Sequence, residues 1–243
     1  MILSIRLVGP DLPAAVTNGD DAFSRIDYPA AIATYEAGLE TDRQDPDLLW
    51  RLARAYVCMA ETQNADSQQT SLRLAERFAR ECTRVAPQMA EGHTWLAGAL
   101  GYLALQTGAK EQIQLSWELL RELDTALATN PDDDAAYSIK GSFYHALGNV
   151  GWLRKNLATL FIGRVPRGGF DNAEEALKRA VAIAPEVMRH AYELGILYID
   201  MGKWDEAIQW LEKASTLPVR AGIDRPRLMK ISELLGNLRN NSH

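Results

Sequence analysis

Four histidines are the residues of this chain best suited to metal binding and proton transfer. They are His93, His145, His190 and His243. No two of them have the spacing of a His-Glu-x-x-His run, in which two imidazoles on one helix face bind zinc. The chain also carries no Walker phosphate loop and no Gly-x-Ser-x-Gly nucleophile turn. The sequence therefore predicts no catalytic residue, no metal site and no cofactor, and we expect that the protein is not an enzyme.

Three consecutive acids and two cysteines are the next candidates. Asp132, Asp133 and Asp134 could hold a cation, or they could begin a helix, where carboxylates interact favourably with the helix dipole. We favour the helix start. Cys58 and Cys82 are too few for a disulfide scaffold or a four-thiolate zinc site. We expect both cysteines to be small buried residues on helix faces.

The overall composition is that of an ordinary folded protein. Of the 243 residues, 47% are hydrophobic and 24% are charged, which supplies enough apolar surface for a core and excludes a disordered chain. The formal net charge is −6, which disfavours the binding of nucleic acid or an anionic membrane across the whole surface. We therefore expect no nucleic-acid partner.

The N-terminal segment gives a weak targeting signal. No apolar run in the chain approaches the roughly 18 residues of a transmembrane helix. Residues 1–8 are apolar but contain Arg6 and have no basic start, so they fit a secretory signal peptide poorly. We expect residues 1–13 to form a tail and residues 14–243 to form one domain. The expected location is the cytoplasm, and the periplasm follows instead if the natural N-terminus is a trimmed signal peptide.

An internal repeat decides the fold, and its clearest copy spans residues 187–218. Two amphipathic helices are predicted there, with a tight turn at residues 201–204 and a proline at the end. Gly195 of the first helix is expected to face Ala207 and Ala214 of the second, because antiparallel helices approach closely where small residues meet. A hairpin of this size cannot bury its apolar face alone, so it needs stacked neighbours.

The same pattern recurs four times upstream. Each earlier copy ends at a proline, and these prolines are Pro46, Pro87, Pro131 and Pro185. We count five helical hairpins, followed by a polar-faced helix near residues 226–239 that caps the stack. The pattern is that of the tetratricopeptide repeat (TPR). The predicted fold class is therefore all-α, a TPR superhelix of about five hairpins with a C-terminal capping helix.

Three hairpins are longer than the usual repeat, and the extra length lies between their two helices. Near residues 63–70 and 108–112 the excess is modest, and longer helices would account for it. At residues 148–171 it amounts to about 20 residues beyond a standard repeat, which predicts an insertion.

The insertion is basic on an acidic chain. Its cations and large apolar residues have the spacing of an amphipathic helix. Such a helix could cross the concave face as a lid, or it could dock on anionic lipid or on an acidic protein surface. We favour the lid, because exposed aromatic clusters are a liability. The candidate residues of the insertion are Trp152, Arg154, Lys155, Phe161, Arg164 and Arg167.

The first helices of a TPR stack line its concave face, so side chains at fixed offsets from their small residue should form a groove. Ala53 in the second hairpin and Gly195 in the fifth are examples of that small residue. The predicted groove residues are Trp50, Arg54, Trp95, Tyr102, Ser138, Ser142, His145, Tyr192 and Ile196. Two interpretations stay open: a binding groove for a peptide or a lipid chain, or side chains packed inside a tight superhelix.

Three stretches of the sequence resemble the TPR region of the regulator of microtubule dynamics family. They are residues 45–55 (DPDLLWRLARA), residues 90–97 (AEGHTWLA) and the insertion from Trp152 to Pro166. The resemblance covers roughly residues 20–235 and includes the same order of long and normal repeats. It implies a helical repeat domain that associates with microtubules or, in one membrane-anchored member, with phospholipid and organelle partners.

These patterns together favour a non-enzymatic TPR interaction module. The expected partner is a protein, either a peptide segment or an acidic surface such as a microtubule. The alternative is a carrier or sensor that holds a lipid or another apolar ligand inside the superhelix.

Overall fold

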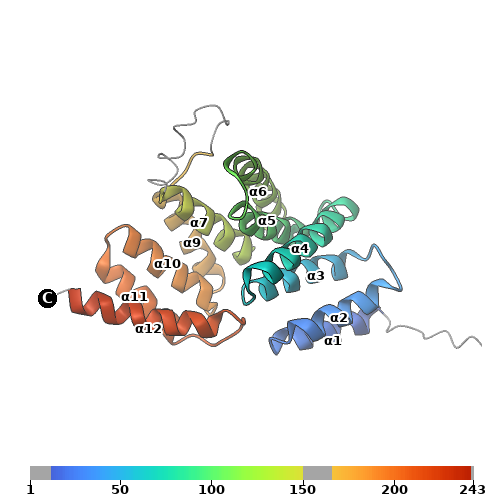
Figure 1. Cartoon of the computed structure of the whole chain (residues 1–243), viewed down its shortest axis with the longest axis horizontal. Coiled ribbons are helices and arrows are strands. Elements are labelled where there is room, and N and C mark those ends of the chain that lie inside the picture. The colour runs from blue at the N-terminus through green and yellow to red at the C-terminus, as the bar shows by residue number, and fades with distance from the viewer. Residues whose placement is uncertain (1–11, 150–165, 242–243) are drawn as a thin grey trace, which may run out of the picture.

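The computed structural model of this chain describes residues 12–149 and 166–241, and every regular element in those residues is a helix. Figure 1 shows the helices as a curved row that begins with α1 and ends with α12. They are α1 (Leu12–Ser24), α2 (Tyr28–Leu39), α3 (Pro46–Ala60), α4 (Ala65–Val85), α5 (Ala90–Ala104), α6 (Ala109–Thr129), α7 (Asp134–Gly148), α9 (Phe170–Ile183), α10 (Met188–Asp200), α11 (Trp204–Ser215) and α12 (Asp224–Asn241).

The helices pair in the order that the repeats predict. The five hairpins are α1 with α2, α3 with α4, α5 with α6, α7 with α9, and α10 with α11. Each hairpin packs on the next, and α12 packs on α11 and α10 as a C-terminal cap. The predicted all-α TPR superhelix with a capping helix is therefore confirmed.

Close approach of the two helices in a hairpin depends on glycine, and the nearest side chain to this glycine is one that the prediction did not name. A Cβ atom on Gly195 would lie 2.7 Å from the side chain of Leu211. Gly195 thus receives a large residue of α11, because a glycine leaves room for a whole side chain in a close-packed interface. Gly141 receives Leu177 of α9 in the same way.

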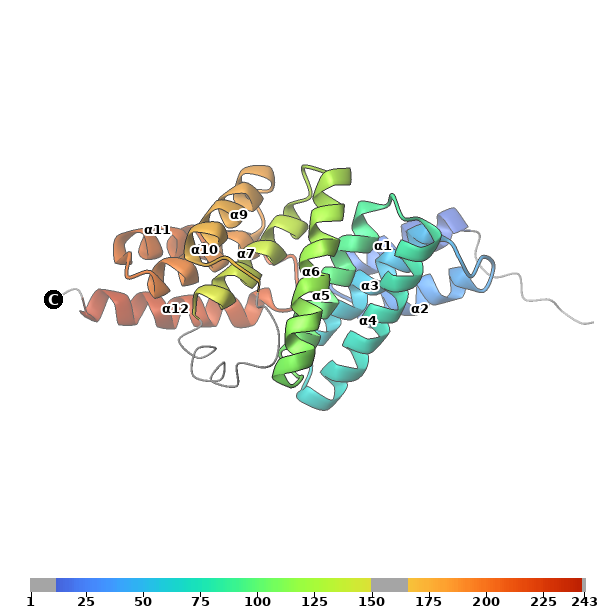
Figure 2. The ribbon, with the colours of Figure 1, turned by 90° about the horizontal axis from the view of Figure 1, so that it is seen from above.

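The two modestly long hairpins contain long helices. Helices α4 and α6 each have 21 residues, whereas α2 and α11 each have 12. Figure 2 shows α4 and α6 side by side, both reaching beyond their neighbours at one edge of the molecule. In the fourth hairpin, α7 ends at Gly148 and α9 begins at Phe170.

The first and last hairpins share one turn geometry. The amide of Asp27 donates to the carbonyl of Ala22, and the amide of Lys203 donates to the carbonyl of Tyr198. This is the Schellman hydrogen bond that ends a helix through a residue in the left-handed conformation. That residue is Ile26 in the first hairpin, with φ 64°, and Gly202 in the fifth, with φ 71°.

The core is a continuous series of apolar clusters between successive helices. Leucines such as Leu52, Leu100 and Leu123 fill the N-terminal part, and Leu177 and Leu194 fill the C-terminal part. Among the helices of the described residues, none has both the length and the hydropathy to cross a membrane.

Candidate functional site

Arg54 of α3 lies between two aromatic rings, at the N-terminal end of the groove that is predicted along the first helices of the hairpins. Its guanidinium carbon is 3.9 Å from the ring centroid of Phe23 and 4.9 Å from that of Trp50, a favourable cation–π arrangement. Its Nε is buried without a hydrogen-bond partner. The predicted groove residues Trp50 and Arg54 therefore lie together, with one buried donor unused.

Asp20 of α1 fixes the position of Arg54. Its carboxylate accepts hydrogen bonds from the Tyr35 hydroxyl (2.7 Å), from Nε of Arg51 (2.9 Å) and from Nη2 of Arg54 (2.9 Å). Burial raises the pKa of Asp20, but the Tyr35 hydroxyl and the two guanidinium groups outweigh it, so the net shift of this pKa is downward. Asp20 is thus ionised at neutral pH and holds three side chains in one network.

Trp95 and Tyr102 of α5 form the middle of the predicted groove. Both are half-buried and pack against the cores of the first three hairpins. The Tyr102 hydroxyl donates to Oε1 of Glu61, which directly follows α3. Burial, together with the charge of Glu61, raises the pKa of Tyr102. Tyr102 is therefore a neutral hydrogen-bond donor.

Glu61 also joins α3 to the fifth hairpin. The same Oε1 is paired with the guanidinium of Arg189 on α10. The side chain of Glu61 is 3% exposed and that of Arg189 is 28% exposed, while Oε2 of Glu61 is buried without a partner. Burial alone would lower the pKa of Arg189, but the neighbouring carboxylate outweighs it and holds this pKa well above its usual range. Glu61 and Arg189 therefore form a charged bridge between the second and fifth hairpins.

The two cysteines are buried, as predicted. Burial, with the nearby charge of Glu61, raises the pKa of Cys58 to about 12. Burial likewise raises the pKa of Cys82 to about 12. Since the thiolate is the reactive form, neither thiol is activated at neutral pH.

Of the three α7 members of the predicted set, Ser138 and His145 are more buried than the aromatic members, and Ser142 is half-buried like them. Ser138 is 2% exposed and its Oγ has no hydrogen-bond partner. Ser142 donates to the carbonyl of Ser138. His145 is buried at the junction of three helices, with Nε2 2.7 Å from Oδ2 of Asp200 and its ring against Phe170. His145 thus contacts α9 and α10 rather than the aromatic groove residues.

Tyr192 and Ile196 of α10 are both half-buried. The guanidinium of Arg227, on the capping helix, lies 5.7 Å from the centroid of the Tyr192 ring. Burial, with the charge of Glu193, raises the pKa of Tyr192. Arg227 is itself buried and paired with Asp224 at 3.0 Å.

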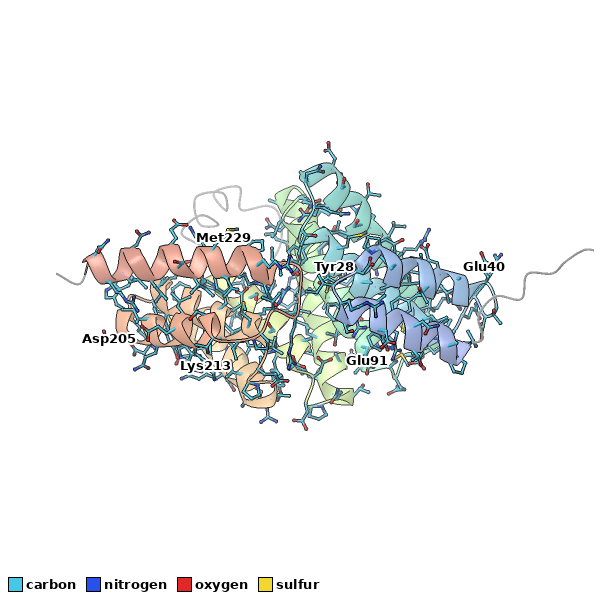
Figure 3. The ribbon with its side chains drawn as sticks, turned by 90° about the horizontal axis from the view of Figure 1, so that it is seen from below. Tyr28, Glu40, Glu91, Asp205, Lys213 and Met229 are labelled. Atoms are coloured by element: carbon cyan, nitrogen blue, oxygen red, sulfur yellow. The ribbon has the colours of Figure 1, made fainter. Side chains whose placement is uncertain are left out.

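A second contact brings the two ends of the superhelix together. The amide of Gly222, in the segment between α11 and α12, donates to the hydroxyl of Tyr28 at 2.9 Å. Burial, together with the charges near it, raises the pKa of Tyr28 to about 12. Figure 3 shows Tyr28 where the first hairpin meets the start of α12.

The structure describes only the two ends of the predicted insertion. Trp152, Arg154, Lys155, Phe161 and Arg164 lie outside the described residues, as do residues 1–11 of the predicted tail. Arg167, the last of the basic candidates, is exposed.

The three acids begin α7, as predicted, and each also reaches another helix. Asp133 is the N-cap and accepts from the Thr94 hydroxyl at 2.6 Å. Asp134 is 2.8 Å from Nε2 of His190, and Asp132 pairs with Arg179. Carboxylates at this helix start therefore connect α7 with α5, α9 and α10.

His93 is an internal contact of the third hairpin. Its Nδ1 is 2.7 Å from Oε2 of Glu122 and its Nε2 is 3.0 Å from the carbonyl of Pro87. The hydrogen bond to Glu122 raises the pKa of His93. Both ring nitrogens face acceptors, which suits the charged imidazolium. No group of three or more potential metal ligands occurs within the described ranges.

Sequence reasoning missed Asp20, Glu61 and Arg189. Glu61 and Arg189 lie at helix ends, outside the offsets that define a groove, and their separation of 128 residues leaves no local signal. A signal for Asp20 does exist. Gly19 precedes Tyr35 by the spacing with which Gly195 precedes Leu211, and this would have placed Asp20 beside the first helix contact.

Solved structures share this fold. A TPR protein from Thermus thermophilus superposes with a TM-score of 0.70 at 22% identity, covering 92% of this chain and 98% of that chain. Yeast Tom70 superposes with a TM-score of 0.59 at 14% identity, covering 96% of this chain and 40% of that chain. At these identities the likeness shows the fold alone.

Curated relatives and a family model give a narrower result. Regulator of microtubule dynamics protein 3 of Bos taurus is 30% identical over 178 residues, 71% of this chain and 37% of the relative. Human regulator of microtubule dynamics protein 2 is 22% identical over 202 residues, 82% of this chain and 49% of the relative. The chain thus spans less than half the length of these relatives. The model of the family "Regulator of microtubule dynamics protein 1-3" matches residues 17–239, and the chain belongs to that family.

Proposed function

We propose that this chain is a protein-interaction module that binds a segment of a partner protein along its concave face. The proposal assigns no catalytic step to it. The observation that supports this role is the row of half-buried aromatic side chains on the first helices of three hairpins: Trp50, Trp95, Tyr102 and Tyr192. Large, rigid aromatic residues of this kind dominate the energy of protein interfaces, because they bury much area at a low cost in conformational entropy.

One polar atom supports the same face. Nε of Arg54 is a buried donor without a hydrogen-bond partner. The backbone of a peptide offers carbonyl acceptors. A segment that lies against α3 would therefore satisfy a donor that the free chain leaves unpaired.

Microtubules are the first partner to test, since the relatives are named as regulators of microtubule dynamics. The experiment is co-sedimentation of the purified chain with polymerised tubulin. We expect the wild type to pellet and the variant Trp50→Ala/Tyr192→Ala to lose about tenfold or more in affinity. Trp117→Ala is the matched control, because Trp117 lies on α6, a second helix, and is 47% exposed.

Two results would count against the proposal. If the double variant bound microtubules as the wild type does, the concave face would not be the contact. If organic extraction of the purified chain released a stoichiometric lipid from the wild type but not from the double variant, the same face would serve the lipid-carrier alternative.

A further inference from the structure

Two contacts join parts of the superhelix that are far apart in the sequence. Arg189 pairs with Glu61 across 128 residues, and Gly222 binds Tyr28 across 194 residues. In a solenoid each repeat normally contacts only its neighbours. These two contacts instead connect the fifth hairpin with the second, and the segment before the cap with the first, so they close the array on itself.

The Glu61–Arg189 contact is a bridge between long side chains. Helices α3 and α10 do not pack against each other along the described part of the chain. Both hydrogen bonds to Glu61, from Tyr102 and Arg189, go to one oxygen, and the other oxygen is buried and unpartnered. An unsatisfied buried acceptor reduces stability, so the closed arrangement is less stable than one in which both oxygens of Glu61 were bonded.

The residues around the Tyr28–Gly222 contact leave room for it and hold its backbone in place. A Cβ on Gly222 would lie 3.0 Å from Thr62 and 3.3 Å from the Tyr28 ring, so glycine permits the close approach. The preceding segment is held by Asp224, whose carboxylate accepts from the amides of residues 220 and 221. The segment is thus preformed to fit against the start of α2 (Figure 3).

The charged bridge also crosses the candidate binding face. Arg189 lies one helical turn before Tyr192 on α10, and its partner Glu61 is bonded to Tyr102. Tyr192 and Tyr102 both belong to the predicted groove. A partner segment that runs from α3 to α10 would meet this bridge between its two ends.

We propose that Glu61–Arg189 and Tyr28–Gly222 form a clasp that holds the free chain closed, and that the clasp opens when a partner segment enters the concave face. The closure depends only on the contacts described above. The gating of partner access rests, in addition, on the proposed function.

The first experiment measures closure. The clasp variant is Tyr28→Phe/Glu61→Gln/Arg189→Met, which removes the hydroxyl and both charges and so leaves no buried charge unpaired. The matched control is Glu212→Gln/Arg239→Met, which removes an ion pair between the neighbouring helices α11 and α12. Spin labels at Ala33→Cys on α2 and Met229→Cys on α12 report the distance between the ends; both positions are exposed, and the native cysteines are buried.

We expect a single short distance in the labelled wild type and in the control, and an added population at longer distance in the clasp variant. Tyr28→Phe alone should show a smaller open population, which provides a readout if the triple variant folds poorly. Distance distributions that are identical in wild type, Tyr28→Phe and the clasp variant would overturn the proposal.

The second experiment measures gating, with microtubules as the probe. We expect the clasp variant to bind about five times more tightly than the wild type, and Trp50→Ala to weaken binding in both backgrounds. If the clasp variant opened but bound no more tightly, while Trp50→Ala still weakened binding, the gating would be wrong. If Trp50→Ala had no effect in either background, the proposed function would fail and the closure would stand.

Discussion

The first and fifth hairpins are built on the same plan and differ in what maintains them. In each, a glycine of the first helix receives a large side chain of the second, Tyr35 against Gly19 and Leu211 against Gly195. In each, the turn passes through a left-handed residue. The fifth hairpin uses a glycine there, with no atom within 4 Å of a Cβ at Gly202. Its turn is therefore encoded by its own residues.

The first hairpin uses residues that need outside support. Ile26 is β-branched, and such residues are strained in the left-handed conformation. Its side chain lies 3.5 Å from the position of a Cβ on Gly222, at the end of the chain that closes on it. Tyr35 is likewise bonded to Asp20, which is held by arginines of α3. The turn of the first hairpin therefore depends on residues outside that hairpin, whereas the turn of the fifth hairpin is formed by its own glycine.

Both hairpins have a glycine that receives a large side chain, and substitution of these glycines should give the largest effects. Gly19→Ala places a Cβ about 2.1 Å from the Tyr35 ring, and Gly195→Ala places one 2.7 Å from Leu211. We expect each to lower the free energy of unfolding by about 2–3 kcal/mol through overpacking. Gly19→Ala should cost more, because the Tyr35 hydroxyl is tied to Asp20 and the ring cannot shift. Urea unfolding measures both; a loss below about 0.5 kcal/mol in either would contradict the close contact.

The next largest effect is expected for a substitution in the left-handed turn of the fifth hairpin. Gly202→Ile introduces the strain of the first hairpin without its packing, and we expect a loss of about 1–2 kcal/mol. Gly202→Asn is the control, because asparagine tolerates this conformation better than a β-branched residue. If the two variants had the same melting temperature, the left-handed turn would impose no steric restriction on the side chain at residue 202.

The pH dependence of stability rests on a different carboxylate in each of the two hairpins. We expect its effect to be smaller than that of the glycine substitutions. The lowered pKa of Asp20 means that its carboxylate stabilises the fold above the unfolded pKa, near 4, and that this contribution is lost as pH falls through the folded pKa. Ile196 takes the equivalent place in the fifth hairpin. Glu174, which contacts that hairpin, keeps a pKa of about 2 because it is bonded to Lys178 and Lys203.

Hydrogen exchange of residues 12–39 and 188–215 at pH 6 and pH 3, corrected for intrinsic rates, measures this difference. We expect faster exchange in the first hairpin at the lower pH, because the stabilisation by the Asp20 carboxylate declines from its unfolded pKa downward. Asp20→Asn should raise exchange of the first hairpin at pH 6 and remove most of its pH dependence, while the pH dependence of the fifth hairpin, which Glu174 contacts, stays as in the wild type. A first hairpin whose acid sensitivity survives Asp20→Asn would contradict the role given to Asp20.

The smallest effect is expected for Ile26→Gly. Relief of backbone strain, about 1–2 kcal/mol, is offset by loss of the isoleucine contacts beside Gly222 and by the greater freedom of glycine in the unfolded chain. The net change in the free energy of unfolding should stay within about 1 kcal/mol. A gain well above that value would mean that Ile26 contributes no packing where the two ends meet.

The fold could be predicted from the sequence because a TPR hairpin is a local object. The glycine at 195, the turn at 201–204 and the prolines after each second helix act within one repeat, and repetition makes them visible. Leu211, the nearest residue to Gly195, was not predicted, since spacing alone does not tell which residue of α11 enters the space that a glycine leaves.

The candidate site was predicted only in part. The structure places Trp50 and Arg54 together and orients Tyr102 toward Glu61, but it places His145 between α9 and α10. The groove residues were predicted from their positions along single helices. The curvature of the superhelix decides which of those helix faces contact one another. Glu61 and Arg189 meet only because five hairpins curve by a certain amount, and no local pattern carries that information.

Closure has a consequence for how this protein can change its length. Open solenoids gain or lose whole modules with little penalty, because each new copy meets an identical neighbour. Here Gly222 must arrive beside Tyr28 after five modules, no more and no fewer. Duplication or deletion of one module would move Gly222 away from Tyr28, so we expect a chain with four or six hairpins to lose this contact.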